Sequence, residues 1–127
     1  MSTQVQVQGN LQITDLLTGV TQLSKVISGI YPLSSVNTFA ESLNIGTSPT
    51  TIFLPVTPTQ VVFIHNLHAT QTVTVTWTPN GGTSAAVCTL QPNGVIFFLE
   101  SNAVSGITAL SLQASGANTN VDYVLAG

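Results

Sequence analysis

Strict alternation of apolar and hydroxyl-bearing residues near the middle of the sequence constrains the fold of this chain. In the segment QTVTVTWTPNGG, Val73, Val75 and Trp77 alternate with threonines, and a Pro-Asn-Gly-Gly turn ends the run. Successive side chains of a strand point to opposite faces, so the segment predicts a strand with one apolar face and one hydroxyl face. Soluble proteins usually cover an outer face with charged residues. The uncharged hydroxyl face therefore predicts contact with another protein subunit or a glycan.

Short runs of the same kind, separated by Pro and Gly, follow one another from Tyr31 onward. They lie at 36–45, 51–56, 60–66, 72–78, 84–90, 95–100, 107–113 and 120–125. Short strands with regular turn signals are typical of a sandwich or barrel. The sequence predicts a mainly β domain over 31–127, an antiparallel β-sandwich that is jelly-roll-like or immunoglobulin-like. Alternation places the following residues in its core: Val73, Val75, Trp77, Val87, Ile96, Phe98 and Leu112.

Residues 1–30 are predicted to form a separate N-terminal arm. Val5 and Val7 alternate with glutamines, which indicates a short strand or hairpin. From Thr14 to Gly29 the apolar residues fit one face of an amphipathic α-helix, although Gly19 inside it costs about 1 kcal/mol relative to Ala. The arm is predicted to be the main interface between subunits. Its predicted interface residues are Val5, Val7, Leu16, Leu17, Val20, Leu23 and Ile27.

Composition excludes several classes of partner. Of 127 residues 43% are hydrophobic and 4% are charged, with one Lys or Arg in total and a formal net charge of −3. Nucleic-acid binding depends on cations that neutralise phosphates, so no nucleic-acid partner is expected. The apolar runs are shorter than the roughly 20 residues that span a bilayer, so no membrane partner is expected. The first residues lack the features of a secretory signal, and we expect synthesis in a cytoplasm.

No catalytic, cofactor or metal site is predicted. His65 and His68 end a predicted strand, where residues three apart face opposite sides, and carboxylate ligands are scarce. Cys88 is the single cysteine and is predicted to be a small core residue. The acidic residues are scattered along the chain, at Asp15, Glu41, Glu100 and Asp122. With no paired acids and no nucleophile motif, the chain is predicted not to be an enzyme.

The sequence resembles small virion proteins of tailed bacteriophages, of the head decoration or minor capsid type. The resemblance lies in a Gln-rich N-terminal strand, an amphipathic helix and a Thr/Val/Ala/Gly-rich sandwich. The segments FIHNLHATQTVTVTWTPNGG, CTLQPNGVIFF and NVDYVLAG are similar to phage sandwich modules. The resemblance implies a virion location, many copies, and assembly with itself and other virion proteins. A homo-oligomer, trimeric or pentameric, is expected for such symmetric contacts.

Two alternatives to a capsid subunit stay open from the residues alone. One is a tail, neck or fibre component of the virion. The other is a glycan-binding or receptor-binding module, with Trp77, Tyr31 or Tyr123 as a stacking platform. A buried Trp77 would favour the structural function, and an exposed aromatic beside polar loops would favour the binding module.

Overall fold

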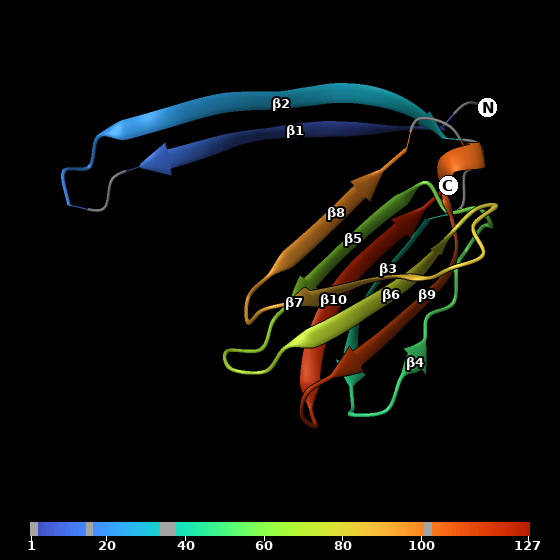
Figure 1. Cartoon of the computed structure of the whole chain (residues 1–127). Coiled ribbons are helices and arrows are strands. Elements are labelled where there is room, and N and C mark those ends of the chain that lie inside the picture. Colours follow the sequence, from blue (N-terminus) through green and yellow to red (C-terminus); the bar gives the residue numbers. More distant parts are fainter. Residues whose placement is uncertain (1–2, 15–16, 34–37, 101–102) are drawn as a thin grey trace.

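A computed structural model describes residues 3–14, 17–33, 38–100 and 103–127, which form an extended two-stranded arm and a β-sandwich (Figure 1). The arm consists of β1 (Thr3–Thr14) and β2 (Thr21–Leu33). The sandwich strands are β3 (Thr38–Ile45), β4 (Thr50–Thr51), β5 (Val61–Asn66), β6 (Val73–Pro79), β7 (Ala86–Leu90), β8 (Val95–Leu99), β9 (Ile107–Ala114) and β10 (Thr119–Ala126). A short 3-10 helix, η1 (Ala103–Ser105), precedes β9.

The sandwich has two four-stranded antiparallel sheets. The first has the strand order β3-β10-β5-β8 and the second the order β4-β9-β6-β7. Because successive strands from β3 to β6 alternate between the sheets, every one of these connections crosses from one layer to the other. Eight strands in two such sheets make a jelly roll. The predicted antiparallel sandwich is therefore confirmed, and of its two predicted forms the jelly-roll-like one is observed.

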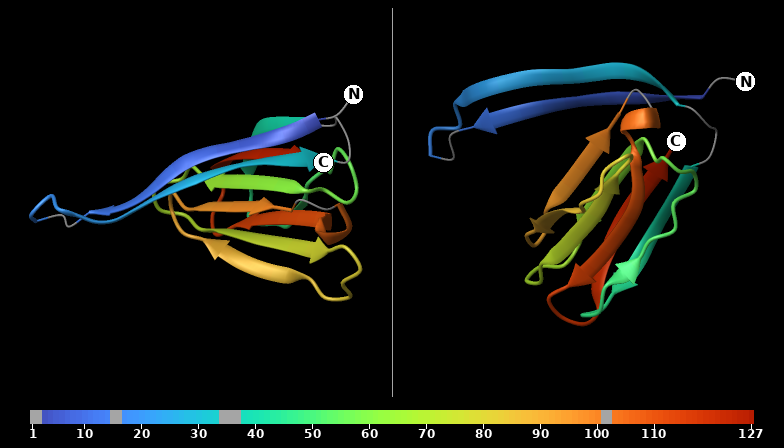
Figure 2. Two further views of the ribbon diagram at one scale, coloured as in Figure 1. Left: turned by 90° about the horizontal axis from the view of Figure 1, so that it is seen from above. Right: turned by 45° about the vertical axis from the view of Figure 1, so that its right-hand side comes forward.

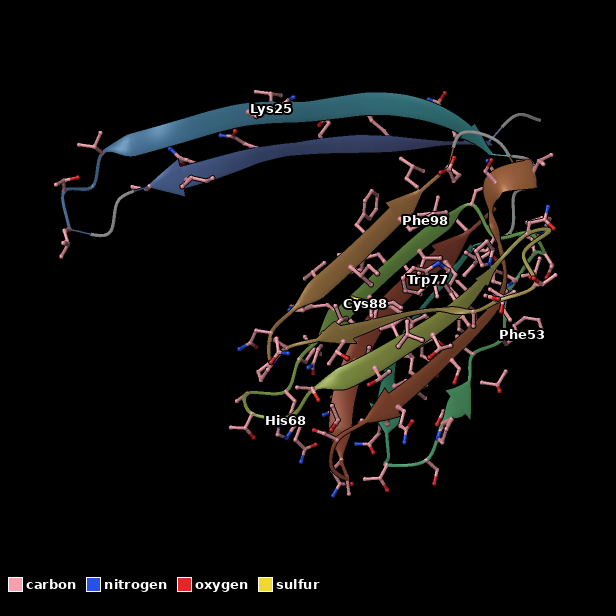
Figure 3. All side chains as sticks on the ribbon, viewed as in Figure 1. Lys25, Phe53, His68, Trp77, Cys88 and Phe98 are labelled. Atoms are coloured by element: carbon pink, nitrogen blue, oxygen red, sulfur yellow. The ribbon has the colours of Figure 1, made fainter. Side chains whose placement is uncertain are left out.

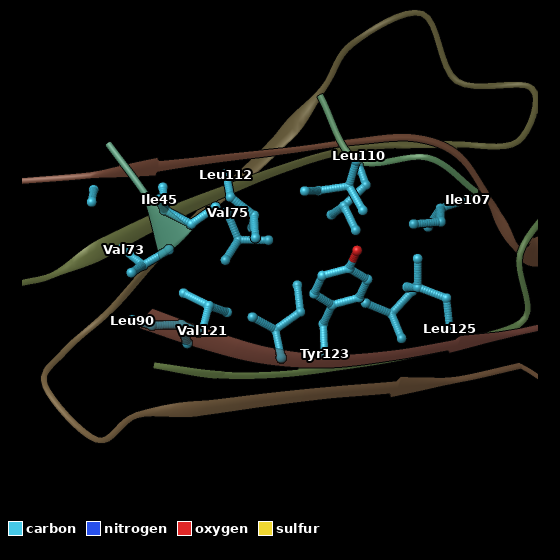
Figure 4. Close-up of a cluster of buried hydrophobic side chains, with 14 residues drawn as sticks. Ile45, Val73, Val75, Leu90, Ile107, Leu110, Leu112, Val121, Tyr123 and Leu125 are labelled. Carbon is cyan, nitrogen blue, oxygen red and sulfur yellow. The ribbon is translucent and has the colours of Figure 1, made fainter. Parts of the chain in front are cut away.

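The core lies between the two sheets and is almost wholly aliphatic (Figure 4). Val73, Val75 and Leu112 of the second sheet are buried, as the alternation predicted. Trp77, Ile96 and Phe98 are partly buried and pack against this cluster, and so does Cys88. The first sheet adds further buried residues, among them Ile64, Val121, Tyr123 and Leu125.

The prediction that Val87 belongs to the core is wrong. Val87 is 64% exposed, while the flanking Cys88 packs against the core. In the register of β6 and β7, Cys88 lies opposite the buried Val75 and Val87 lies opposite Thr76. Because paired residues share a face, the partner strand decides which alternate residues of β7 point inward. In the isolated segment AVCTL, both phases contain apolar residues.

The predicted N-terminal helix is also wrong, because its described residues form the end of β1, a turn and the first part of β2, while residues 15–16 lie outside the described ones. β2 pairs antiparallel with β1 in a register that includes Leu11 opposite Lys25 and Ile13 opposite Leu23. Gly19 has a φ of 69°, a left-handed conformation suited to the turn and not to a helix. Segment 20–28 contains Val, Thr and Ile, whose branched side chains favour strands over helices. The β-propensity of these residues and their pairing with β1 outweigh the helix-like spacing of the apolar residues.

The remaining strand predictions hold within two residues except at 51–56. There β4 is limited to Thr50–Thr51. The next residue, Ile52, makes one more hydrogen bond toward β9, from its N–H to the carbonyl of Leu110 at 2.9 Å. Pro55 and Pro58 follow, and proline lacks the N–H that a ladder needs. The segment therefore leaves the sheet after one short pairing with β9.

Candidate interaction surface

Among the described residues, one row of polar side chains crosses the first sheet: Asp122 of β10 lies opposite His65 of β5 and opposite Ser42 of β3, whose hydroxyl donates to Asp122 Oδ1. No group of three or more His, Cys, Asp or Glu side chains that could hold a metal occurs in the described part of the chain. Glu41 and Asp122 lie on β3 and β10, Glu100 follows β8, and Asp15 lies outside the described residues. Cys88 is a free, partly buried thiol.

His65 and His68 occupy different environments. His65 is part of β5, while His68 lies in the following loop and accepts two backbone hydrogen bonds at Nδ1, from Thr70 N–H at 3.1 Å and Gln71 N–H at 3.0 Å. Acceptance at Nδ1 leaves the ring proton on Nε2. The role of His68 in this arrangement is to hold the loop between β5 and β6.

Asn66 is a fully buried polar residue that links the two sheets. Its Nδ2 donates to the carbonyls of Gln71 at 2.8 Å and Gln91 at 3.1 Å, and its Oδ1 accepts from His68 N–H at 3.0 Å. Both ends of the amide are thus satisfied by backbone groups of the loops that border β6 and β7. A buried polar group that is fully hydrogen-bonded fixes the local arrangement of the chain.

Two of the three aromatic residues considered as glycan platforms serve the core. Tyr123 is buried, and its hydroxyl donates to Glu41 Oε2 at 2.9 Å. Trp77 packs against the core cluster. The side chain of Tyr31 lies outside the described ones. Burial of Tyr123 removes its ring from stacking with a sugar at the surface.

In the described sheets, β8 lies at an edge and pairs on one side only, with β5. Asn66 N–H donates to Gly94 O and Glu100 N–H donates to Gln60 O, both at 2.9 Å, at either end of the β5–β8 ladder. In an antiparallel pair every second residue hydrogen-bonds to the partner, so Ile96 and Phe98 face β5 and the alternate residues face outward. The outward residues are Val95, Phe97 and Leu99. Their N–H and C=O groups form a free edge.

The free edge of β8 is apolar and lacks the usual protection. Native proteins block such edges with charged residues, prolines or bulges, and β8 (VIFFL) contains no charge and no proline, and its register with β5 is unbroken. Val95 and Phe97 are 50% and 49% exposed. The sequence signal that could have identified this edge is the uncharged run 95–99, whose alternation predicted only a core strand.

An apolar cavity of about 90 Å³ lies between the two sheets, with residues of β8 and β6 among those that line it. Ile96, Phe97 and Phe98 line it from β8, and Val75 and Trp77 line it from β6. Figure 3 shows Trp77 and Phe98 on the two facing sheets. An apolar void of this kind leaves its lining atoms without packing partners on one side.

The arm runs out past one end of the sandwich in both views of Figure 2. Its strands pair with each other and make no extensive contact with a sandwich strand. Exposed on it are Gln4, Gln6, Gln8 and Gln12 of β1 and the apolar Val26 of β2, which is 72% exposed. A protruding hairpin with exposed amide and apolar side chains is a second interaction surface.

The predicted interface residues are distributed over the arm. Val5 and Val7 lie in β1, and Leu23 and Ile27 lie in β2, with side chains outside the described ones. Leu17 and Val20 lie in the turn and are exposed. Leu16 lies outside the described residues. The helical face that was to unite five of these residues does not exist, since two lie in the turn and two in a strand.

The chain has little similarity to known proteins. No protein-family model matches it, and no curated protein matches it. Among solved structures, a chain reported as "Bacillus endospore appendages form a novel family of disulfide-linked pili" matches with a TM-score of 0.47 and 11% sequence identity, covering 70% of this chain and 80% of that chain. A likeness at this TM-score carries no argument. In the described residues, no helix combines the length and the apolar character needed to cross a membrane.

Proposed function

We propose that the chain is a non-enzymatic structural subunit that assembles with copies of itself. The observation that carries this proposal is the arm, whose two strands pair only with each other in the described sheets. An isolated two-stranded hairpin is marginally stable in water, and a third strand or a packing surface is needed to stabilise it. A neighbouring copy supplies both.

The composition of the surface supports the same proposal. With 4% charged residues, the chain exposes mostly uncharged side chains, both hydroxyl and amide groups and apolar residues such as Phe53 and Val87. Such groups cost less to remove from water than charges do, provided that their hydrogen bonds are replaced. A surface of this kind suits burial between subunits.

The finer proposal is a virion protein of a tailed bacteriophage, a capsid decoration or minor capsid subunit or, alternatively, a tail, neck or fibre component. It is supported by the sequence resemblance and by the jelly roll, an architecture used by viral capsid domains among others. Copies are expected to form a trimer or pentamer, since homo-oligomers usually have closed symmetry.

Light scattering of the purified chain over a range of concentrations tests the coarser proposal. We expect a mass several times that of one 13.2 kDa chain, which falls on dilution or when residues 1–33 are deleted. Circular dichroism of the deletion variant, with a retained cooperative thermal transition, checks that the sandwich still folds. A full-length chain that stays monomeric at every concentration would contradict the proposal. Mass spectrometry of phage particles tests the finer one.

A further inference from the structure

We propose that β2 of one copy adds to the free edge of β8 in a second copy, with Lys25 of the first beside Glu100 of the second. This proposal rests on the proposed function, because it names the contact through which the copies assemble. The addition would extend the sheet β3-β10-β5-β8 to a fifth strand.

The acceptor is the backbone edge of Val95, Phe97 and Leu99. These residues direct their N–H and C=O groups away from β5, as the hydrogen bonds at Gly94 and Glu100 establish. An added strand binds such an edge through main-chain hydrogen bonds.

The donor must come from a second copy. In Figure 1 and in the right-hand view of Figure 2 the arm lies at one end of its own sandwich and runs obliquely to β8, without lying along its edge. One edge of β2 pairs with β1, and its other edge has no partner strand in the described sheets. Strand β2 is 13 residues long, which exceeds the five residues of β8.

The distribution of charge favours binding of β2 from one copy to the sandwich of a neighbouring copy. The arm, residues 1–33, has one cation and one acid, Lys25 and Asp15, and a formal charge of 1 − 1 = 0. The sandwich has three acids and no Lys or Arg, and therefore a formal charge of −3. Lys25 is exposed on β2 (Figure 3), so the single cation of the chain is carried by the arm. Two sandwiches repel each other, whereas Lys25 attracts an acidic neighbour.

Glu100 is the acid that Lys25 can reach from this edge, because it directly follows β8. An antiparallel register that places Lys25 opposite Glu100 also places Val26 opposite Leu99. The exposed Val26 would then meet an apolar residue of the acceptor edge.

The other edges of the sandwich fit this donor less well. β4 has two residues, which is too short to hold a strand. β3 carries Glu41, whose carboxylate is already engaged by the hydroxyl of Tyr123. At β7 the outward residues are Val87 and Thr89, with no acidic residue in the strand or in the turn that follows it. β8 alone among these combines a free apolar edge with an adjacent acid.

A charge-reversal cycle on the full-length chain tests the proposal. Lys25→Glu and Glu100→Lys should each raise the concentration at half-assembly by at least about threefold, since each puts like charges together. The double variant should restore assembly. The control is Glu41→Lys, which reverses a charge on the β3 edge and should not rescue Lys25→Glu. Because it also removes the acceptor of the Tyr123 hydroxyl, circular dichroism checks that this variant is folded.

A pair of proline variants tests the edge itself. Phe97→Pro removes an outward N–H from β8, and Val87→Pro makes the equivalent change on β7. In neither case is a hydrogen bond of the sandwich lost, because both residues face outward. Phe97→Pro should reduce assembly at least tenfold, and Val87→Pro should leave it within about twofold of the wild type.

The outcomes separate this proposal from the function on which it rests. Rescue by the double variant together with loss of assembly in Phe97→Pro would support the contact. If the wild type assembles but Glu41→Lys rescues Lys25→Glu, or Val87→Pro blocks assembly and Phe97→Pro does not, the β8 contact is wrong and the structural function stands. If the wild type never assembles, both are wrong.

Discussion

The hydroxyl of Tyr123 donates a 2.9 Å hydrogen bond to Glu41 Oε2, across the register pair that joins β10 to β3. The ring is buried, so its ionised form would lose most of its hydration. Burial, the hydrogen bond to Glu41 and the negative charge of Glu41 raise the pKa of Tyr123 to about 12. The core thus contains a phenol that is held neutral beside a carboxylate at the surface.

Alkaline pH should destabilise the sandwich through Tyr123. The pKa of Tyr123 in the folded protein lies above the unfolded value of 10.0, so the folded protein holds the hydroxyl proton more strongly than the unfolded chain does. The neutral hydroxyl therefore contributes its full stabilisation of the fold below pH 10. This contribution to the unfolding free energy, roughly 2 to 3 kcal/mol in total, is lost as the pH rises toward 12. Urea unfolding at pH 8, 10 and 11.5 measures this loss. Tyr123→Phe, the matched control, should flatten the pH dependence, and an unchanged slope would contradict the assignment.

Removing the amide of Asn66 should be costly. Asn66→Ala leaves the carbonyls of Gln71 and Gln91 and the N–H of His68 without this partner in a buried region, so we expect a loss of about 2 to 4 kcal/mol in unfolding free energy. Asn120→Ala is the matched control, since Asn120 is exposed and its side-chain oxygen accepts a hydrogen bond from Asn44 at 3.0 Å. That variant should stay within about 0.5 kcal/mol of the wild type. Equal losses in the two would refute the structural role of Asn66.

Filling the apolar cavity should stabilise the monomer. Val75 lines the cavity, so Val75→Ile adds a methylene group next to empty space and should raise the unfolding free energy by up to about 1 kcal/mol. Val73 is buried on the same face of β6 but does not line the cavity. Val73→Ile should therefore overpack the core and cost about 1 to 3 kcal/mol. Thermal unfolding of both variants checks the opposite signs, and a destabilised Val75→Ile would argue against usable space there.

The assignment of Val87 to the exposed face of β7 can be tested by comparing the same truncation there and at the buried Val121 of β10. Val121→Ala removes two methyl groups from a fully buried site and should cost about 2 kcal/mol. Val87→Ala makes the same change at a 64% exposed site and should be within about 0.5 kcal/mol of neutral. Chemical denaturation measures both. A large loss for Val87→Ala would restore Val87 to the core.

The sequence by itself determined the sandwich, because alternation has a physical cause that acts within each strand. Val73, Val75 and Leu112 had to share a buried face once their segments were extended, and the Pro and Gly residues marked the ends of the strands. Only the tertiary structure decided which way β7 faces, since Val87 and Cys88 are both acceptable core residues and the partner Val75 selects between them.

The arm shows the same division. A spacing of apolar residues compatible with a helix favoured the wrong structure, because the competing pairing with β1 depends on residues about 15 positions away along the chain. The open edge of β8 likewise follows from the order of strands in the sheet, which no local pattern contains. Sequence determined what each segment can bury, and tertiary pairing decided which strand edges were left unpaired.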